Sequence, residues 1–216
     1  MFRRIILILV FLVCLCGCQV SKDSLLTNLD TILDDATVSS ISSKVNMNKG
    51  LMSYYLQPSI GRKESNATNS IFVINGNDVI MNIDVSSIVS QKYYASSSDI
   101  RAIGTFGNQI YEKKGVFISS TDLVRDYLYR LFEVSNEQYG IILQTSNIIM
   151  VAVVPLGDVY NVSSEMMTLI RGCRVDEEAV VSAYSQKEMI NYQKETLDIF
   201  EKVYPEEGTL LEMGEE

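Results

Sequence analysis

The chain contains no histidine and no tryptophan among its 216 residues. Without histidine, Ser-His-Asp and Cys-His catalysis are excluded, and so are zinc, copper and haem sites with imidazole ligands. Without tryptophan, the commonest platform for stacking sugar rings or quaternary ammonium groups is missing, although 12 tyrosines could partly replace it. We therefore expect a protein that is not an enzyme and that binds neither a metal nor a cofactor.

Cysteine is scarce outside the first 18 residues, where three of the four cysteines lie. The remaining thiol, Cys173, has no second cysteine nearby with which to form an internal disulfide, so the fold must be stable on its core alone. Arg171 and Arg174 flank it, but no imidazole is available to activate it as a nucleophile. We expect Cys173 to be a small buried hydrophobic residue near a helix end.

The N-terminus combines a positive charge with a short apolar run. Arg3 and Arg4 precede an unbroken apolar segment from Ile5 to Val13. This segment suits the core of a signal peptide and is shorter than the roughly 20 residues that a transmembrane helix needs. It ends in Leu15-Cys16-Gly17-Cys18, which resembles the lipobox of bacterial lipoproteins. Of the three cysteines, only Cys18 follows a small residue.

The lipobox resemblance implies cleavage before Cys18 and attachment of lipid to that cysteine. Two or three acyl chains hold a protein durably on a bilayer, so the membrane would be a partner through this lipid. The expected location is the outer face of the cell membrane. Gln19 is not the Asp that commonly retains lipoproteins at an inner membrane, which leaves the outer membrane of a two-membrane cell open. The alternative is an ordinary signal peptide or uncleaved anchor with incidental cysteines.

These features divide the chain into a signal peptide (1–17), a lipidated tether (18–22), one domain (23–205) and an acidic tail (206–216). Without Arg3 and Arg4, the mature part has 16 basic and 27 acidic side chains. This balance argues against recognition of nucleic acid or of anionic lipid headgroups, because either would need a basic surface.

Hydrophobic periodicity predicts an α+β fold. Two hairpins are the clearest features, 71–83 around Asn75-Gly76 and 139–154 around Ser146-Asn147. The other predicted elements are helices at 23–35, 84–90, 161–171 and 176–204, strands at 51–56, 100–106 and 109–118, and a short helix turning into a strand within 119–134. We expect a mostly antiparallel sheet, with the N-terminal helix and two C-terminal helices packed on one side.

The polar segment from Pro58 to Asn69 is the best candidate for a binding loop. Ser59, Arg62 and Lys63 place a hydroxyl and two cations in an otherwise acidic protein. An arginine in such a loop could bind a carboxylate or phosphate with two parallel hydrogen bonds. The alternative is a solvated loop with ordinary charges.

Three functions remain open from the sequence. The favoured one is a non-enzymatic protein-interaction or assembly module of the cell envelope, with a protein partner there. The alternative is a small-ligand sensor or carrier with a pocket between the sheet and the C-terminal helices. A hydrolase with carboxylates or a Ser-Lys pair is the least favoured, because no Ser-x-x-Lys sequence is present.

Overall fold

The strands that the structure describes form two antiparallel sheets of very different size. The computed structural model describes residues 22–94, 100–135 and 137–185. The large sheet has the order β3 (Gly61–Ser65), β4 (Asn69–Ile74), β5 (Asn77–Ile83), β9 (Ile148–Pro155), β8 (Gln138–Gln144), β7 (Val124–Glu133) and β6 (Asn108–Ile118). The small sheet has the order β1 (Met47–Asn48), β2 (Met52–Tyr54) and β10 (Arg174–Val175). The predicted α+β class is confirmed.

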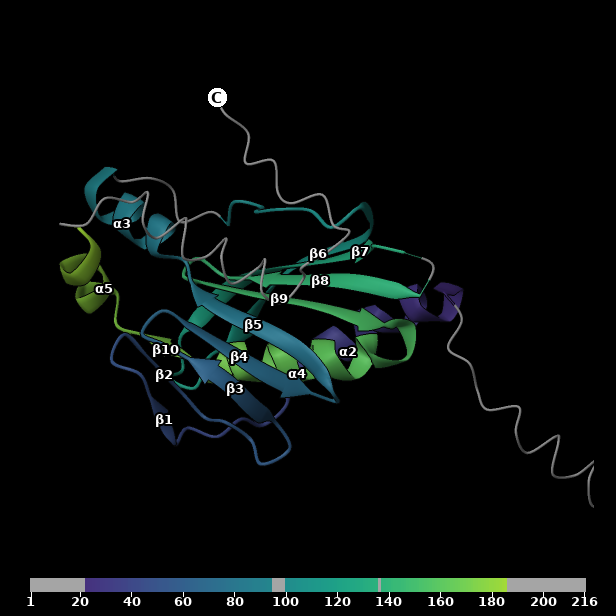
Figure 1. Cartoon of the computed structure of the whole chain (residues 1–216), viewed down its shortest axis with the longest axis horizontal. Coiled ribbons are helices and arrows are strands. Elements are labelled where there is room, and N and C mark those ends of the chain that lie inside the picture. The colour runs from purple at the N-terminus through teal and green to yellow at the C-terminus, as the bar shows by residue number, and fades with distance from the viewer. Residues whose placement is uncertain (1–21, 95–99, 136, 186–216) are drawn as a thin grey trace, which may run out of the picture.

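Helices cover one face of the large sheet. α2 (Lys22–Val38) and α4 (Val159–Gly172) lie side by side, with α4 against β8 and β9 and α2 against β6 (Figure 1). A 3-10 turn, η1 (Leu156–Asp158), leads into α4. The described part of the second C-terminal helix, α5 (Glu177–Tyr184), lies instead against α3 (Val85–Tyr94). The rest of the helix predicted to 204, the tail 206–216, the signal peptide and Cys18 lie outside the described residues.

The core lies between the sheet and the pair α2 and α4. Leu25, Leu29 and Leu33 are fully buried at spacings of four residues, which places them on one face of α2. Alternate residues of β7, β8 and β9 face them, because successive strand side chains point to opposite sides of a sheet. The core residues on those three strands are Tyr127, Tyr129, Leu131, Tyr139, Ile141, Leu143, Ile148, Met150, Ala152 and Val154.

The predicted short helix within 119–134 is wrong, because Val124–Glu133 is strand throughout. Tyr129 and Leu131 point into the helix-covered core, while Leu128 and Phe132 are buried on the opposite face. A strand buried on both faces has a nearly continuous apolar sequence, which a helical period fits equally well. Ser119, predicted to start the helix, belongs to a tight turn in which its hydroxyl accepts the N–H of Leu123.

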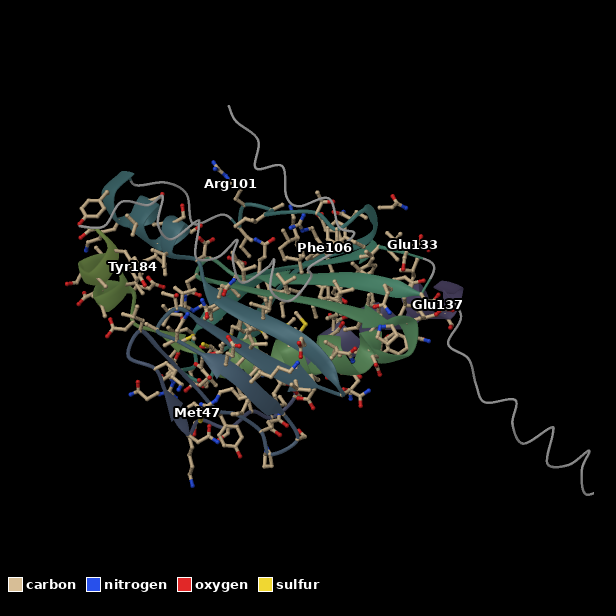
Figure 2. All side chains as sticks on the ribbon, viewed as in Figure 1. Met47, Arg101, Phe106, Glu133, Glu137 and Tyr184 are labelled. Atoms are coloured by element: carbon tan, nitrogen blue, oxygen red, sulfur yellow. The ribbon has the colours of Figure 1, made fainter. Side chains whose placement is uncertain are left out.

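The predicted strand at 100–106 is also wrong. This segment crosses the second face of the large sheet, and its backbone bonds to side chains instead of to a strand. The Gln144 amide donates to Arg101 O at 3.1 Å and accepts the N–H of Ile103 at 3.2 Å. Phe106, labelled in Figure 2, packs against Gly140, where a Cβ atom would stand only 2.8 Å from the Phe106 Cβ. The glycine in β8 therefore makes room for this crossing segment.

Arg171 joins three elements at the end of the helical layer. It is 4% exposed, and its guanidinium donates to Ala36 O and, at 2.9 Å, to Ser39 O. Its Nε donates to Ile118 O at 3.3 Å, at the end of β6. Because the last turn of α2 contains no basic residue, this arginine from α4 supplies the charged donor at the helix end, where Ala36 O also accepts the Ser39 hydroxyl.

Replacing Arg171 should therefore destabilise the fold. We expect Arg171→Met to lower the free energy of unfolding by about 2–4 kcal/mol, because three elements would lose their hydrogen bonds to one charged donor and the buried Ala36 carbonyl would keep only the Ser39 hydroxyl. Urea denaturation measures the change. The matched variant Arg62→Met, at an exposed edge position, should change the free energy by less than about 0.5 kcal/mol. Equal losses in the two variants would contradict the role given to Arg171.

Candidate functional site

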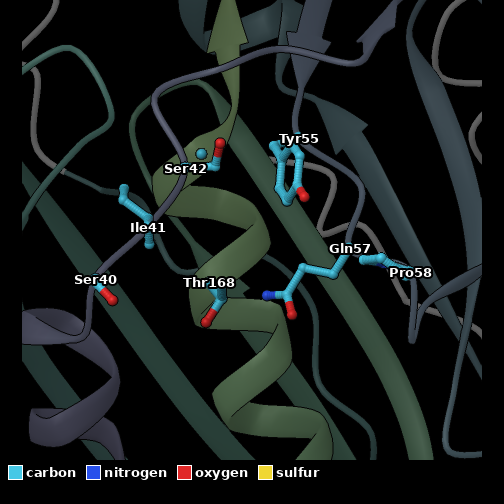
Figure 3. Close-up of a pocket in the computed structure, with 8 residues that line it drawn as sticks. Ser40, Ile41, Ser42, Tyr55, Gln57, Pro58 and Thr168 are labelled. Carbon is cyan, nitrogen blue, oxygen red and sulfur yellow. The ribbon is translucent and has the colours of Figure 1, made fainter.

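A half-open groove lies on the outer side of α4, away from the sheet. Its volume is about 210 Å³, and its walls come from the chain after α2, the chain after β2 and the C-terminal half of α4 (Figure 3). The lining residues are Ser40, Ile41, Ser42, Tyr55, Gln57, Pro58, Thr168 and Gly172. The groove thus brings together segments that are more than 100 residues apart in the sequence.

The groove is polar but carries no charged side chain in its lining. Thr168 donates its hydroxyl to Ser164 O at 3.0 Å, and the Ser42 hydroxyl accepts the N–H of Lys44 at 3.2 Å. Ligand pockets usually have volumes of about 300–1,000 Å³, so this groove is smaller than most of them. It also lies outside the sheet–helix interface where a ligand pocket was expected, and the small-ligand function stays a prediction.

The predicted binding residues lie beside the groove, not in it. Ser59 is exposed in the turn before β3, and Arg62 and Lys63 lie on β3 itself. The prediction of a loop over 58–69 is wrong for 61–65, which pair with β4 at the edge of the large sheet. Lys63 is engaged in an ion pair with Asp78 at 2.6 Å, while the Arg62 guanidinium lies 3.8 Å from the sulfur of Met47. The three side chains do not form a common site.

Cys173 occupies the C-cap position of α4, close to the helix end as expected, but the residue is only partly buried, packed against the core. Burial raises the pKa of its thiol to about 12, against a small opposing effect of the Arg174 backbone N–H. The thiol is therefore protonated at neutral pH. A protonated thiol is a poor nucleophile and a poor metal ligand, which argues against a reactive role for this residue.

Arg130 is a buried cation on the second face of the sheet. It is 5% exposed and donates to Gly104 O at 2.9 Å and to Gln144 Oε1 at 2.9 Å. Its guanidinium carbon also lies 5.3 Å from the centre of the Phe132 ring. Burial lowers the pKa of this guanidinium. These contacts hold the crossing segment 100–106 against β7 and β8. We therefore interpret Arg130 as a structural residue.

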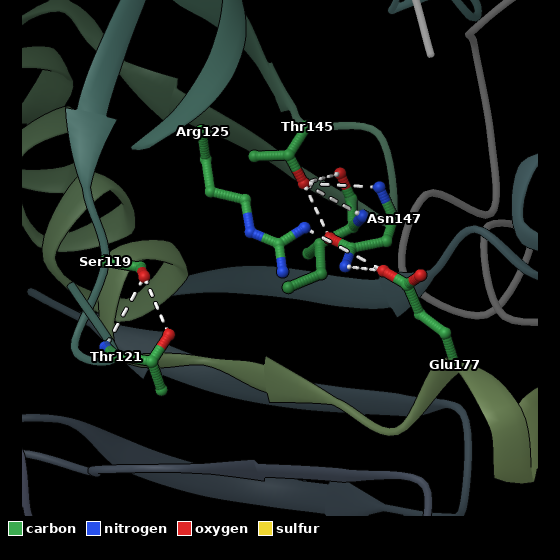
Figure 4. A network of polar contacts seen from close by, with 7 residues as sticks. Ser119, Thr121, Arg125, Thr145, Asn147 and Glu177 are labelled. Carbon is green, nitrogen blue, oxygen red and sulfur yellow. Dashed lines mark hydrogen bonds and ion pairs between the residues drawn. The ribbon is translucent and has the colours of Figure 1, made fainter. Parts of the chain in front are cut away.

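A polar network connects the turn between β8 and β9 to the start of α5 (Figure 4). The Asn147 amide donates to Glu177 Oε1 at 2.8 Å, and Arg125 lies 3.8 Å from the same oxygen. The Asn147 carbonyl also accepts the N–H of Asp84, the residue before α3. The network positions α3 and α5 against the sheet, which is a structural role.

An exposed apolar surface lies at the end of the β6–β7 hairpin where the turn joins the two strands. Val116 and Ile118 are each 56% exposed, Leu123 is 52% exposed and Val124 is 70% exposed. Ile118 lies directly opposite Val124 in the register of the hairpin. We call these four residues the hairpin-end patch. Sequence reasoning did not identify it, because a strand of alternating valine, phenylalanine and isoleucine is equally typical of a buried core strand.

Comparison with known proteins gives no functional assignment. No family model and no curated protein matches the chain. Three chains of solved structures match, among them a crystal structure from Bacteroides thetaiotaomicron with 10% sequence identity and a TM-score of 0.28. The match covers 60% of this chain and 46% of that one, and a likeness this weak carries no argument.

Two further properties concern the described residues alone. None of their helices is both long and apolar enough to cross a membrane. Within the same ranges, no group of three or more His, Cys, Asp or Glu side chains is arranged to hold a metal ion.

The state of Cys173 can be tested by thiol labelling. At pH 8 we expect the native protein to leave Cys173 unmodified by iodoacetamide, because a thiol with a pKa of about 12 is almost entirely protonated there. The urea-unfolded chain should be modified readily. Mass spectrometry of the proteolytic peptide that contains Cys173 reads both results. Rapid labelling of the native protein would show that the thiol is accessible and ionised.

Proposed function

We propose that the protein is a lipoprotein held on the outer face of a membrane, where it acts as a non-enzymatic protein-interaction module. Lipid on Cys18 would set its location, and the hairpin-end patch would contact its protein partner. The lipobox Leu15-Cys16-Gly17-Cys18 supports the first part. The exposure of the patch supports the second part and is the observation on which the interaction role depends.

The patch is unusual because three of its four apolar residues lie together on one face of the hairpin. Single exposed hydrophobic residues are common on soluble proteins and need no explanation. Here Ile118 and Val124 are paired across the hairpin, and Val116 follows Ile118 on the same face of β6. Leu123 is exposed beside the turn, on the opposite face from Val124. Contiguous exposed apolar surface of this kind is typical of sites that bind another protein.

The charge of the chain supports a protein partner over other macromolecules. The net charge is −9, and the exposed surface at the hairpin end includes Asp126 directly opposite Val116. An acidic protein with an apolar contact surface is poorly suited to the phosphates of nucleic acids. A protein surface with apolar residues and a polar rim would match the patch.

The anchor can be tested at Cys18 itself. Cys18→Ser should abolish incorporation of labelled fatty acid and release the protein from the membrane fraction, because the acyl chains supply the attachment. The matched variant Cys16→Ser keeps the glycine–cysteine pair and should be labelled and sedimented like the unchanged chain. Labelling that persists in Cys18→Ser, or that disappears in Cys16→Ser, would contradict the proposed anchor.

The contact surface can be tested with a photo-crosslinking amino acid in the producing cell. Placed at Val116, it should give a discrete protein adduct, because this side chain would lie within the interface. Placed at Val38, which is 79% exposed at the end of α2, it should give no such adduct. Mass spectrometry identifies the product. If Val116 yields no adduct, or if both positions yield the same one, the hairpin-end patch is not a protein-binding surface.

A further inference from the structure

The two edges of the large sheet differ in length and protection. β3 forms one edge with only five residues, a bulge between Arg62 and Glu64, and charged side chains at three of its positions. Short, bulged and charged edges resist pairing with further strands. β6 forms the other edge with eleven residues, and the pairing of its Tyr111–Ile118 part with β7 is regular. Within the described residues, β6 is therefore the edge available for pairing.

The register of the hairpin shows which backbone groups of β6 face outward. The N–H of Ser119 donates to Leu123 O, so Ser119 points its backbone toward β7. Because bonding alternates along an antiparallel strand, the odd-numbered residues from Tyr111 to Phe117 also bond to β7. The even-numbered residues Glu112, Lys114 and Val116 point their N–H and C=O groups to the open edge. Ile118 has the same orientation, but its carbonyl accepts Arg171 Nε from α4, so the open part of the edge ends before it.

The outward-facing residues also carry alternating charges. Lys114 and Glu112 are 75% and 40% exposed, and their nearest charged atoms are 4.0 Å apart within the strand. In an antiparallel pair of two β6 strands centred on Lys113, Glu112 of each copy would lie opposite Lys114 of the other. Opposite charges in directly facing positions stabilise a strand pair, whereas like charges destabilise it. The charges on two antiparallel β6 edges are therefore complementary.

We propose that β6 pairs in an antiparallel manner with β6 of a second copy of this chain, which makes one continuous sheet across a two-fold dimer. The inference rests on the proposed interaction role and names its partner as a second copy. Residues 112 and 114 supply both the backbone hydrogen bonds and the crossed ion pairs. The hairpin-end patch lies beside this pairing and contributes apolar contact.

Two electrostatic repulsions would oppose this dimer, one between the two Lys113 side chains and one between the net negative charges of the two copies. Centring on Lys113 brings two lysines together, but each is bound in its own chain by Asp30 at 3.1 Å and Asp34 at 2.8 Å. The net charge of −9 repels two copies at long range. Physiological salt screens such repulsion beyond about 8 Å, whereas the crossed pairs act at contact. Because β3 is protected, pairing at β6 closes at two copies and does not continue into a fibre.

Charge exchange at the edge tests this dimer. The full chain, extracted in detergent, should sediment as a protein dimer. Glu112→Lys alone and Lys114→Glu alone should each raise the dimer dissociation constant roughly tenfold, since two facing pairs change from attractive to repulsive. The double variant, with both residues exchanged, restores the crossed pairs and should return the dissociation constant to within about threefold of the original. Arg62→Glu on the protected edge is the matched control and should have no effect.

The outcomes separate this inference from the proposed function. A chain that stays monomeric at every concentration, or single variants that dimerise like the unchanged chain, would overturn the β6 dimer. So would a double variant that is no better than the singles, provided that circular dichroism shows all variants folded. A Val116 adduct with the mass of two copies supports the dimer, whereas an adduct with a different protein overturns it and leaves the proposed interaction role in place.

Discussion

An open β-sheet ends in two strands whose outer N–H and C=O groups find no partner within the sheet. A protein must protect these edges or use them. Here the β3 edge is short, bulged and charged, with Lys63 held in an ion pair to Asp78. The β6 edge is long, and near its end the charged residues give way to Val116 and Ile118. The interaction role that we propose depends on this difference between the two edges.

Side-chain contacts with α2 and α4 hold β6 firmly in place. A strand that is already rigid is well suited to pair with a second strand. The Tyr111 hydroxyl donates to Asp30, and Lys113 bridges Asp30 and Asp34 one turn apart on α2. Burial, together with the hydrogen bond to Asp30, raises the pKa of Tyr111, so its hydroxyl remains a donor at any physiological pH. At the far end, Arg171 bonds Ile118 O. A strand fixed at both ends loses little conformational entropy when a partner pairs with it.

Local signals in the sequence predicted much of the fold. Asn75 and Gly76 have φ angles of 51° and 81°, as a two-residue hairpin turn requires, and both predicted hairpins are present. The helix predicted at 84–90 is α3, and the carboxylate of Asp84 before it accepts the N–H of Ser87 at 3.0 Å. The errors arose where tertiary contacts decide, as in β7, which is buried on both faces. No short stretch of the sequence predicts the groove or the edge residues, because strand order and the approach of distant segments depend on the whole chain.

Residue-resolved hydrogen exchange along β6 tests the central claim most directly. The backbone amides of Glu112 and Lys114 point to the open edge, whereas those of Gly115 and Phe117 bond to β7. We predict that Glu112 and Lys114 exchange slowly at high protein concentration and quickly on dilution, while Gly115 and Phe117 stay protected at both. Fast exchange of Glu112 and Lys114 at every concentration would contradict the account.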